Sequence, residues 1–243
     1  MLKSEKHKIY LRAATVIFIL AELAFFPLIQ LTPGDVSAFW SYISIICVAL
    51  YAALTVRKGR HAHLIRLGIA LTLVADYFLV LKSDLLPGVL AFILVQAAYF
   101  GYLFFSEDRR ALRVANALSR TVLSLVLPLA AWLVLGEDTD ALAIASVIYY
   151  GNLIVNAVFA FLLGRRERIF AIGLVLFAMC DLCIGLEVLF SSYLDSAALD
   201  FFYGANLNLP WVFYQPSQVL IALSLNKTSP IPCKAIDKTG VLI

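Results

Sequence analysis

Long apolar runs separated by short polar connections make up most of the chain. Eight runs approach or exceed the roughly 20 residues that an α-helix needs to cross the hydrocarbon core of a bilayer. They cover residues 9–31, 36–56, 64–82, 86–105, 115–135, 141–163, 170–190 and 205–225. This pattern predicts an all-α, polytopic integral membrane bundle of eight transmembrane helices. We expect a single transmembrane domain over residues 1–243, ending in a cytoplasmic tail over 226–243.

The connections alternate in charge, and this alternation predicts the orientation of the helices. Eighteen of the 19 basic residues lie at the N-terminus, in every second connection and in the tail. The opposite connections are acidic or neutral, as around Asp35, Asp84 and Asp138, and only Lys82 is basic there. Because Lys and Arg accumulate in cytoplasmic loops, we expect both termini in the cytoplasm. The cluster between the fourth and fifth runs consists of Arg109, Arg110, Arg113 and, just beyond them, Arg120.

Composition supports the membrane assignment. The chain is 63% hydrophobic and 14% charged, whereas a soluble domain carries about 25% charged residues. The net charge of +3 is small, and no basic patch with interleaved aromatic residues indicates nucleic acid as a partner. We expect a multi-pass protein of a bacterial inner membrane rather than of an internal eukaryotic membrane; the sequence leaves the oligomeric state open.

The eighth run differs from the others because it is polar and contains two prolines, Pro210 and Pro216. Prolines free backbone carbonyls that other groups within a bundle must satisfy. This pattern predicts a kinked helix that lines a cavity. A weak internal similarity, which we call the echo, relates the segment from Gly68 to Asp76 to the segment from Gly173 to Asp181. The echo is compatible with a 4+4 parallel repeat.

Four acidic residues lie inside the apolar runs, namely Glu22, Asp76, Asp181 and Glu187. Acids at such depth usually face the interior of a bundle. Glu22, Asp76 and Asp181 each lie about a dozen residues from the inner end of their run, so all three are near the midplane at about 1.5 Å per residue. Glu187 lies nearer the outer interface and points away from Asp181. A structural, hydrogen-bonded role is the alternative for each acid, and it is favoured for Glu22 and Glu187, whereas the matched depth of the two aspartates favours a shared site.

Uncharged polar side chains occur at matching depth. Gln96 and Tyr99 share one helical face, and Tyr149, Asn152 and Asn156 follow a helical stripe, as do Trp211, Tyr214 and Gln218. Such groups commonly join helices by hydrogen bonds, but together they could surround a polar pocket. We therefore take as candidate substrate-binding residues Gln96, Tyr99, Asn152, Asn156, Tyr214, Gln218 and Glu22.

Several kinds of chemistry are disfavoured by the sequence. The three histidines lie in the predicted cytoplasmic segments, so we expect no histidine base and no metal site within the membrane. Cys180 and Cys183 form a C-x-x-C without a second pair or a nearby histidine, and we interpret them as small apolar residues in a helix. We expect no cofactor. Two buried carboxyl groups remain, of which one can stay protonated while the other is ionised. Reactions that pass through an oxocarbenium ion use this division.

At these residues the sequence resembles the YhhN-like family of lysoplasmalogenases. The similarity is carried by the segments ending in Asp76 and Asp181, by Gln96 with Tyr99, and by Leu209–Pro–Trp–Val–Phe–Tyr214–Gln–Pro–Ser–Gln218. The family usually has Gly where this chain has Ala75 and His where it has Gln96. Because glutamine cannot titrate, the second difference bears on proton handling or head-group contact.

The resemblance implies an eight-span enzyme, an alkenyl-ether hydrolase that takes a lysophospholipid from the bilayer. It would hydrolyse the vinyl ether bond of lysoplasmalogens to a fatty aldehyde and a glycerophospho-alcohol, with Asp76 and Asp181 as catalytic residues and without metal or cofactor. Two alternatives remain open. Midplane acids equally suit a small-molecule or proton-coupled transporter, and a structural or pigment-binding bundle is a third possibility, although no lysine lies deep enough for a Schiff base.

Overall fold

A computed structural model describes residues 2–55, 61–193 and 208–226, and the described residues are almost entirely helical. The side chains of residues 2–8, 166 and 188–193 are not described. The α-helices are α1 (Leu2–Leu31), α2 (Gly34–Leu54), α3 (Ala62–Asp76), α4 (Leu85–Ser106), α5 (Arg110–Leu135), α6 (Ala141–Leu162), α7 (Arg168–Tyr193) and α9 (Leu209–Leu223). A π-helical turn, η1 (Tyr77–Leu81), continues α3. Short 3-10 turns lie at Gly136–Asp138, Gly164–Glu167 and Ser224–Asn226.

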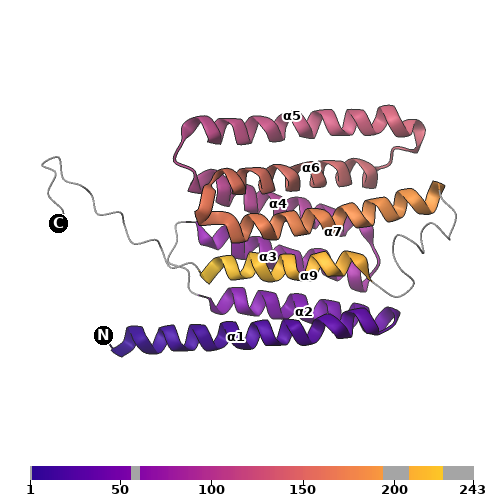
Figure 1. The fold of residues 1–243 in the computed structure, drawn as a ribbon. Coiled ribbons are helices and arrows are strands. Elements are labelled where there is room, and N and C mark those ends of the chain that lie inside the picture. Colours follow the sequence, from indigo (N-terminus) through magenta and orange to yellow (C-terminus); the bar gives the residue numbers. More distant parts are fainter. Residues whose placement is uncertain (1, 56–60, 194–207, 227–243) are drawn as a thin grey trace, which may run out of the picture.

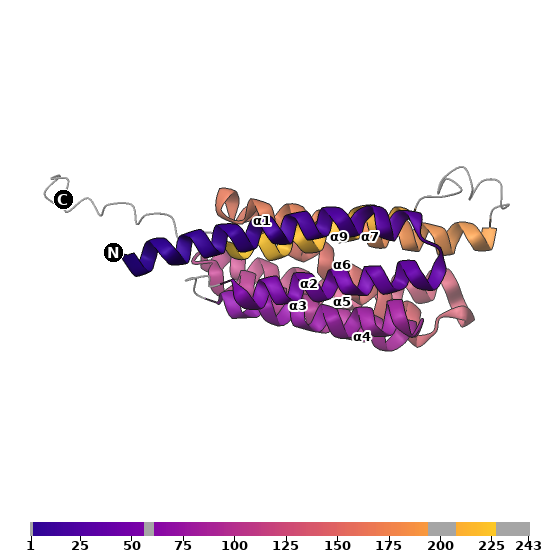
Figure 2. The same ribbon diagram turned by 90° about the horizontal axis from the view of Figure 1, so that it is seen from below.

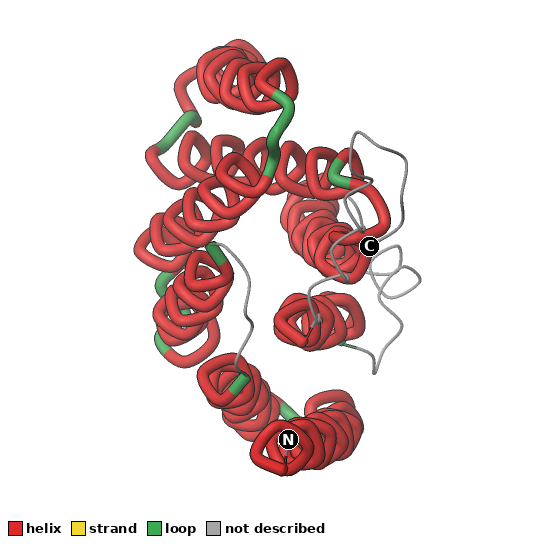
Figure 3. The backbone as a smooth tube through the Cα atoms, turned by 90° about the vertical axis from the view of Figure 1, so that its left-hand side faces the viewer, coloured by secondary structure: helices red, strands yellow, loops and turns green. Residues whose placement is uncertain are grey.

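The helices run roughly parallel or antiparallel to one another in an elongated bundle (Figures 1 and 2). Contacts follow the order α1, α2, α3, α4, α6, α7 and α9, and α9 also packs against α1 and α2. Seven helices thus form a closed arrangement, seen end-on in Figure 3. Helix α5 lies outside this ring and packs along α6. Its outer face is apolar and exposed, as expected for a helix in contact with lipid.

Among the described residues, seven helices are long and apolar enough to cross a membrane, so the chain is a multi-pass membrane protein. They match the first seven predicted runs with modest shifts at the ends. The eighth predicted span, 205–225, corresponds to α9, which begins at Leu209 with Pro210 in its first turn. Fifteen residues reach only about 22 Å at 1.5 Å per residue, so α9 alone is shorter than the hydrocarbon core. Nearly all of the predicted tail over 226–243 and the start of this span lie outside the described residues.

The predicted number of spans, the orientation and the 4+4 repeat stay predictions. Asn226, which follows α9, hydrogen-bonds Thr15 in the middle of α1 and Tyr51 near the end of α2. The end of α9 therefore lies beside the end of α2.

Two glycines allow close helix packing beside the polar centre. A Cβ atom on Gly68 would lie 2.2 Å from Cε1 of Tyr99, so α3 and the Tyr99 ring on α4 approach as closely as a glycine permits. A Cβ atom on Gly173 would lie 2.8 Å from Ile221 and 3.0 Å from the carbonyl oxygen of Ser217. Both glycines lie two turns before an aspartate, and both bring the aspartate's helix against a neighbour that carries polar groups.

Candidate functional site

Asp76 occupies the last turn of α3, directly before the π-helical turn Tyr77–Leu81. Its side chain is 2% exposed, and its Oδ2 accepts a 2.6 Å hydrogen bond from the hydroxyl of Tyr214 on α9. π-Helical turns inside α-helices frequently occur at functional sites. The fold thus encloses this carboxyl group inside the bundle, where a neutral hydroxyl donates to it.

Asp181 on α7 has an equivalent arrangement. Its Oδ2 accepts a 2.6 Å hydrogen bond from the hydroxyl of Tyr149 on α6. Among the described residues, no lysine or arginine forms an ion pair with either aspartate. Each carboxyl group is therefore held by one tyrosine from a neighbouring helix rather than neutralised by a cation.

The two tyrosines belong to one aromatic cluster. Phe177 lies between them, with ring centroids 5.3 Å from Tyr214 and 6.3 Å from Tyr149. Phe92 on α4 stacks on Tyr149 at 5.4 Å and contacts Phe177 at 5.3 Å. The cluster connects the tyrosine partners of Asp76 and Asp181 through adjacent rings. The structure therefore brings the predicted pair into one region.

A second polar group lies on α4, α5 and α6. Arg120 on α5 is 8% exposed and donates to three amide oxygens, those of Asn116 (3.2 Å), Asn152 (2.6 Å) and Asn156. Its guanidinium also lies over the ring of Phe100, 4.4 Å from the centroid. The amide nitrogen of Asn156 donates to Oε1 of Gln96 at 2.8 Å and to the Gln96 backbone carbonyl at 3.1 Å. Asn152 and Asn156, predicted to bind substrate, thus have their amide oxygens engaged by Arg120.

Besides Glu22, three of the predicted site residues keep a polar atom that is fully buried and unpaired. These atoms are Nε2 of Gln96, Oε1 of Gln218 and the hydroxyl of Tyr99. The Tyr99 hydroxyl lies beside Thr72 but makes no hydrogen bond of ordinary geometry. Native structures leave few buried polar groups unsatisfied, and each such group calls for an explanation such as a water or a ligand. These side chains are thus candidates for contact with a bound polar molecule.

Glu22 differs from the two aspartates because it joins three helices. Its Oε2 accepts from the hydroxyl of Ser44 on α2 at 2.6 Å and from Nε2 of Gln215 on α9 at 2.8 Å. Gln215 also donates to the Glu22 backbone carbonyl. Only Oε1 of Glu22 is buried without a partner. The contacts support the structural alternative for Glu22, while leaving one oxygen unpaired.

The described part of the chain contains no group of three or more His, Cys, Asp or Glu side chains that could hold a metal ion. Cys180 and Cys183 are both buried on α7, which agrees with the interpretation of both as apolar residues. Glu187 is exposed on the same helix.

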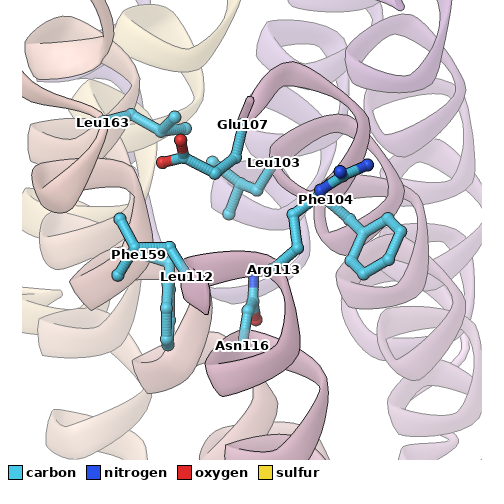
Figure 4. Close-up of a pocket in the computed structure, with 8 residues that line it drawn as sticks. All are labelled: Leu103, Phe104, Glu107, Leu112, Arg113, Asn116, Phe159 and Leu163. Carbon is cyan, nitrogen blue, oxygen red and sulfur yellow. The ribbon is translucent and has the colours of Figure 1, made fainter. Parts of the chain in front are cut away.

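A small hollow lies where α4 ends and α5 begins (Figure 4). Glu107, Arg113 and Asn116 line it together with apolar side chains, among them Phe159 and Leu163. Glu107 is paired with Arg109 at 2.8 Å, and Arg113 extends over the ring of Phe104. Asn116 connects this hollow with Arg120, whereas the aspartates lie elsewhere in the bundle.

Sequence reasoning misassigned or missed three participants. Arg120 was predicted to belong to a cytoplasmic charged cluster, and this is wrong, because α5 begins at Arg110 and carries Arg120 about 15 Å along the helix at 1.5 Å per residue. Asn116, four residues earlier, is the signal that could have indicated a buried polar face. Gln215 was missed because the helical stripe favoured Tyr214 and Gln218, and Tyr149 was noticed without its role as the partner of Asp181.

Comparisons with known proteins identify the family. The family model described as the YhhN family matches residues 36–225, and this segment contains both aspartates and both tyrosine partners. No curated protein and no solved structure matches the chain. Since the match covers well over half of the sequence, the chain belongs to the YhhN family, and the resemblance stated from its motifs is confirmed. Glu22 and α1 lie outside the matched segment.

Proposed function

We propose that this member of the YhhN family hydrolyses the vinyl ether bond of lysoplasmalogens, releasing a fatty aldehyde and a glycerophospho-alcohol. The observation that carries the proposal is the pair of aspartates, Asp76 buried and Asp181 partly buried, each held by a tyrosine hydroxyl within one aromatic cluster. The family match is compatible with a hydrolase. The lipid would enter between helices from the bilayer, with its tail remaining among apolar side chains.

The chemistry needs one carboxylic acid and one carboxylate. The acid donates its proton to the β-carbon of the vinyl ether, which converts the double bond to a single bond and leaves an oxocarbenium ion. The carboxylate stabilises this cation and takes a proton from the water that attacks it. The resulting hemiacetal transfers its hydroxyl proton to the ether oxygen and breaks into aldehyde and alcohol. One water is consumed, and the two carboxyl groups have then exchanged roles, so a proton transfer from the second carboxyl group back to the first restores the starting state.

The environment of the aspartates suits this division of roles. Two carboxyl groups that interact in a buried site cannot both be ionised cheaply, so one retains its proton. Each tyrosine hydroxyl donates to one carboxyl oxygen and leaves the second oxygen of that carboxyl group for the reaction. The aromatic rings around the pair exclude bulk water, and their electron-rich faces can stabilise a nearby cation.

The deciding experiment measures aldehyde release by the purified protein in detergent or nanodiscs. The substrate is an alkenyl lysophospholipid, and the control is the saturated alkyl analogue, which cannot be protonated to an oxocarbenium ion. In water labelled with oxygen-18, the glycerophospho-alcohol should keep its ordinary oxygen, because water attacks the vinyl carbon; label in the alcohol would instead indicate cleavage at the glycerol side. Absence of aldehyde from the well-folded protein would refute the proposal and favour the transporter alternative, for which the same acids would carry protons.

A further inference from the structure

The network from Arg120 to Gln96 fixes the direction in which each amide points. An arginine side chain has only hydrogen-bond donors, so Asn156 must turn its oxygen toward Arg120. The nitrogen of Asn156 then faces Gln96 and donates to Oε1 at 2.8 Å. Consequently, the remaining polar atom of the Gln96 side chain is the nitrogen Nε2. The orientation of both amides follows from the chemistry of the arginine and does not depend on telling nitrogen from oxygen.

Gln96 therefore presents donors, and these donors are unused. The side chain is 1% exposed, and Nε2 has no hydrogen-bond partner among the described residues. Hydrogen bonds from neighbouring helices fix the orientation of this buried donor but leave it without a partner. Such a donor is suited to bind an acceptor atom of a ligand. Gln218 on α9 is oriented the other way. Ser217 donates its hydroxyl to the Tyr214 carbonyl and can only accept from Gln218, so Gln218 keeps its oxygen unpaired.

The charge of Arg120 specifies what kind of acceptor is favoured. In the described part of the chain its side-chain partners are neutral amide oxygens and an aromatic ring, and no carboxylate is paired with it. A buried cation without an anionic partner favours a negatively charged group nearby. Among the oxygens of a lysophospholipid, those of the phosphodiester combine negative charge with acceptor capacity, whereas the glycerol hydroxyl is neutral.

The positions along the helices agree with the dimensions of such a lipid. Gln96 lies ten residues from the end of α4 at Ser106, and Asp76 lies fourteen residues from the start of α3 at Ala62, near the same end of the bundle. At 1.5 Å per residue the two differ in depth by about 6 Å, which is about one helical turn. In a lysophospholipid the glycerol backbone separates the vinyl ether from the phosphate by a similar length. Phe92, one turn from Gln96 on α4, stacks on the tyrosine that holds Asp181.

We infer that Arg120, acting through Asn156, holds Gln96 so that its amide N–H groups receive the phosphate of the lysophospholipid substrate. This inference rests on the proposed function for the identity of the lipid. Gln96 is the binding residue, and Arg120 and Asn156 are positioning residues.

The test measures binding of two ether lipids that cannot be hydrolysed. They are 1-O-alkyl-lysophosphocholine and the 1-O-alkylglycerol of the same chain length, which lacks the phosphate. The wild-type protein should bind the phosphate-bearing lipid at least tenfold more tightly. In Gln96→Met, which keeps the length of the side chain and removes its donors, this preference should fall about tenfold, as for the loss of a hydrogen bond to a charged group. Asn156 can still donate to the Gln96 backbone carbonyl in this variant, so the fold should be maintained.

A matched pair of variants isolates the positioning role. Asn156→Asp places an oxygen where the amide nitrogen was, so Gln96 should turn its own oxygen toward the lipid and the preference should fall about tenfold. Asn152→Asp adds the same negative charge beside Arg120, but the nitrogen of Asn152 donates to the Ile148 carbonyl rather than to Gln96. This control should keep most of the preference. Equal losses in the two variants would overturn the positioning role, because they would show that only the charge matters.

The outcome separates the inference from the proposed function. If the wild-type protein prefers the phosphate-bearing lipid and the Gln96 and Asn156 variants lose this preference, the inference holds whether or not aldehyde is released. If aldehyde is released but the wild-type protein binds both lipids equally, the proposed function stands and the inference is wrong. An unchanged preference in Gln96→Met would also overturn it.

Discussion

Replacing Asp76 or Asp181 by asparagine is the sharpest test of the catalytic assignment. Asparagine keeps the shape of the side chain and one oxygen, and the 2.6 Å hydrogen bonds from Tyr214 and Tyr149 can still be made to that oxygen. It cannot donate or take up a proton in the reaction. The substitution therefore removes the proposed chemistry while preserving the contacts that hold the two helices.

The expected magnitudes separate catalysis from stability. General acid–base catalysis contributes typically 10²–10⁴-fold, which corresponds to about 2.7–5.4 kcal/mol at 1.36 kcal/mol per factor of ten. Changing the acceptor from a carboxyl oxygen to an amide oxygen alters one buried hydrogen bond by about 1 kcal/mol. Membrane insertion should not suffer, because a neutral amide is less costly than an acid in the bilayer. Each variant should thus fold normally and lose 10²–10⁴-fold in aldehyde release.

The assay compares aldehyde release by folded variants, with thermal unfolding in detergent as the check on folding. Glu187→Gln is the matched control, because it makes the same kind of exchange on α7 at an exposed position. Its activity should stay within about twofold of the wild type, since surface substitutions away from specific contacts have small effects. Near-normal rates in both Asp76→Asn and Asp181→Asn would refute the catalytic pair and shift the weight to transport.

Three further predictions follow from the packing, the charges and the topology. Gly68→Ala should destabilise the protein by about 1–3 kcal/mol through overpacking against Tyr99, as measured by thermal unfolding. The control Gly185→Ala should be neutral or stabilising, because a Cβ atom there meets nothing within 4 Å. Equal effects of the two substitutions would contradict the close-packing argument. The Arg109 side-chain hydrogen bond holds the pKa of Glu107 below its usual range. At pH values above the ordinary glutamate pKa of about 4.3, Glu107→Gln should therefore lower the melting temperature, and this difference from the wild type should fade as the pH falls through the lower pKa of the folded state. A difference independent of pH would argue against the ion pair. Reporter fusions in the connections at Asp84 and Asp138 should report an external location, and a cytoplasmic signal at Asp138 would overturn the predicted orientation.

The sequence predicted the helices well because the bilayer imposes a simple rule. Every crossing helix needs a long apolar run, and seven of the predicted runs correspond to helices that meet this condition. The ends were less predictable, since an arginine such as Arg110 can begin a helix as readily as end a loop. The π-helical turn after Asp76 could not be predicted either, because Tyr77–Leu81 is as apolar as the α-helical turns around it.

The candidate site was predictable as far as depth alone could determine it. Equal depth placed Asp76 and Asp181 together, and the helical stripe placed Tyr214 near them, as its hydrogen bond to Asp76 shows. Depth could not tell which polar groups bind each other and which are left free. The stripe through Asn152 and Asn156 suggested contact with a substrate, but their amide oxygens bind Arg120. This contact could not be predicted, because Arg120 is far from both asparagines in the sequence.

Arg120 shows why charge patterns in membrane proteins need the helix boundaries before they can be interpreted. The rule that basic residues mark cytoplasmic loops holds for exposed side chains near the ends of helices, and Arg120 fails it because α5 begins ten residues earlier. Burying an arginine within a membrane bundle costs free energy. The orientation of the helices does not explain why this arginine is buried, so another role is needed to explain it. Three amide oxygens hold it in place, and one of these amides orients Gln96. The same residue that weakens the topological argument therefore strengthens the functional one, because it gives a buried glutamine a defined direction toward an anionic group.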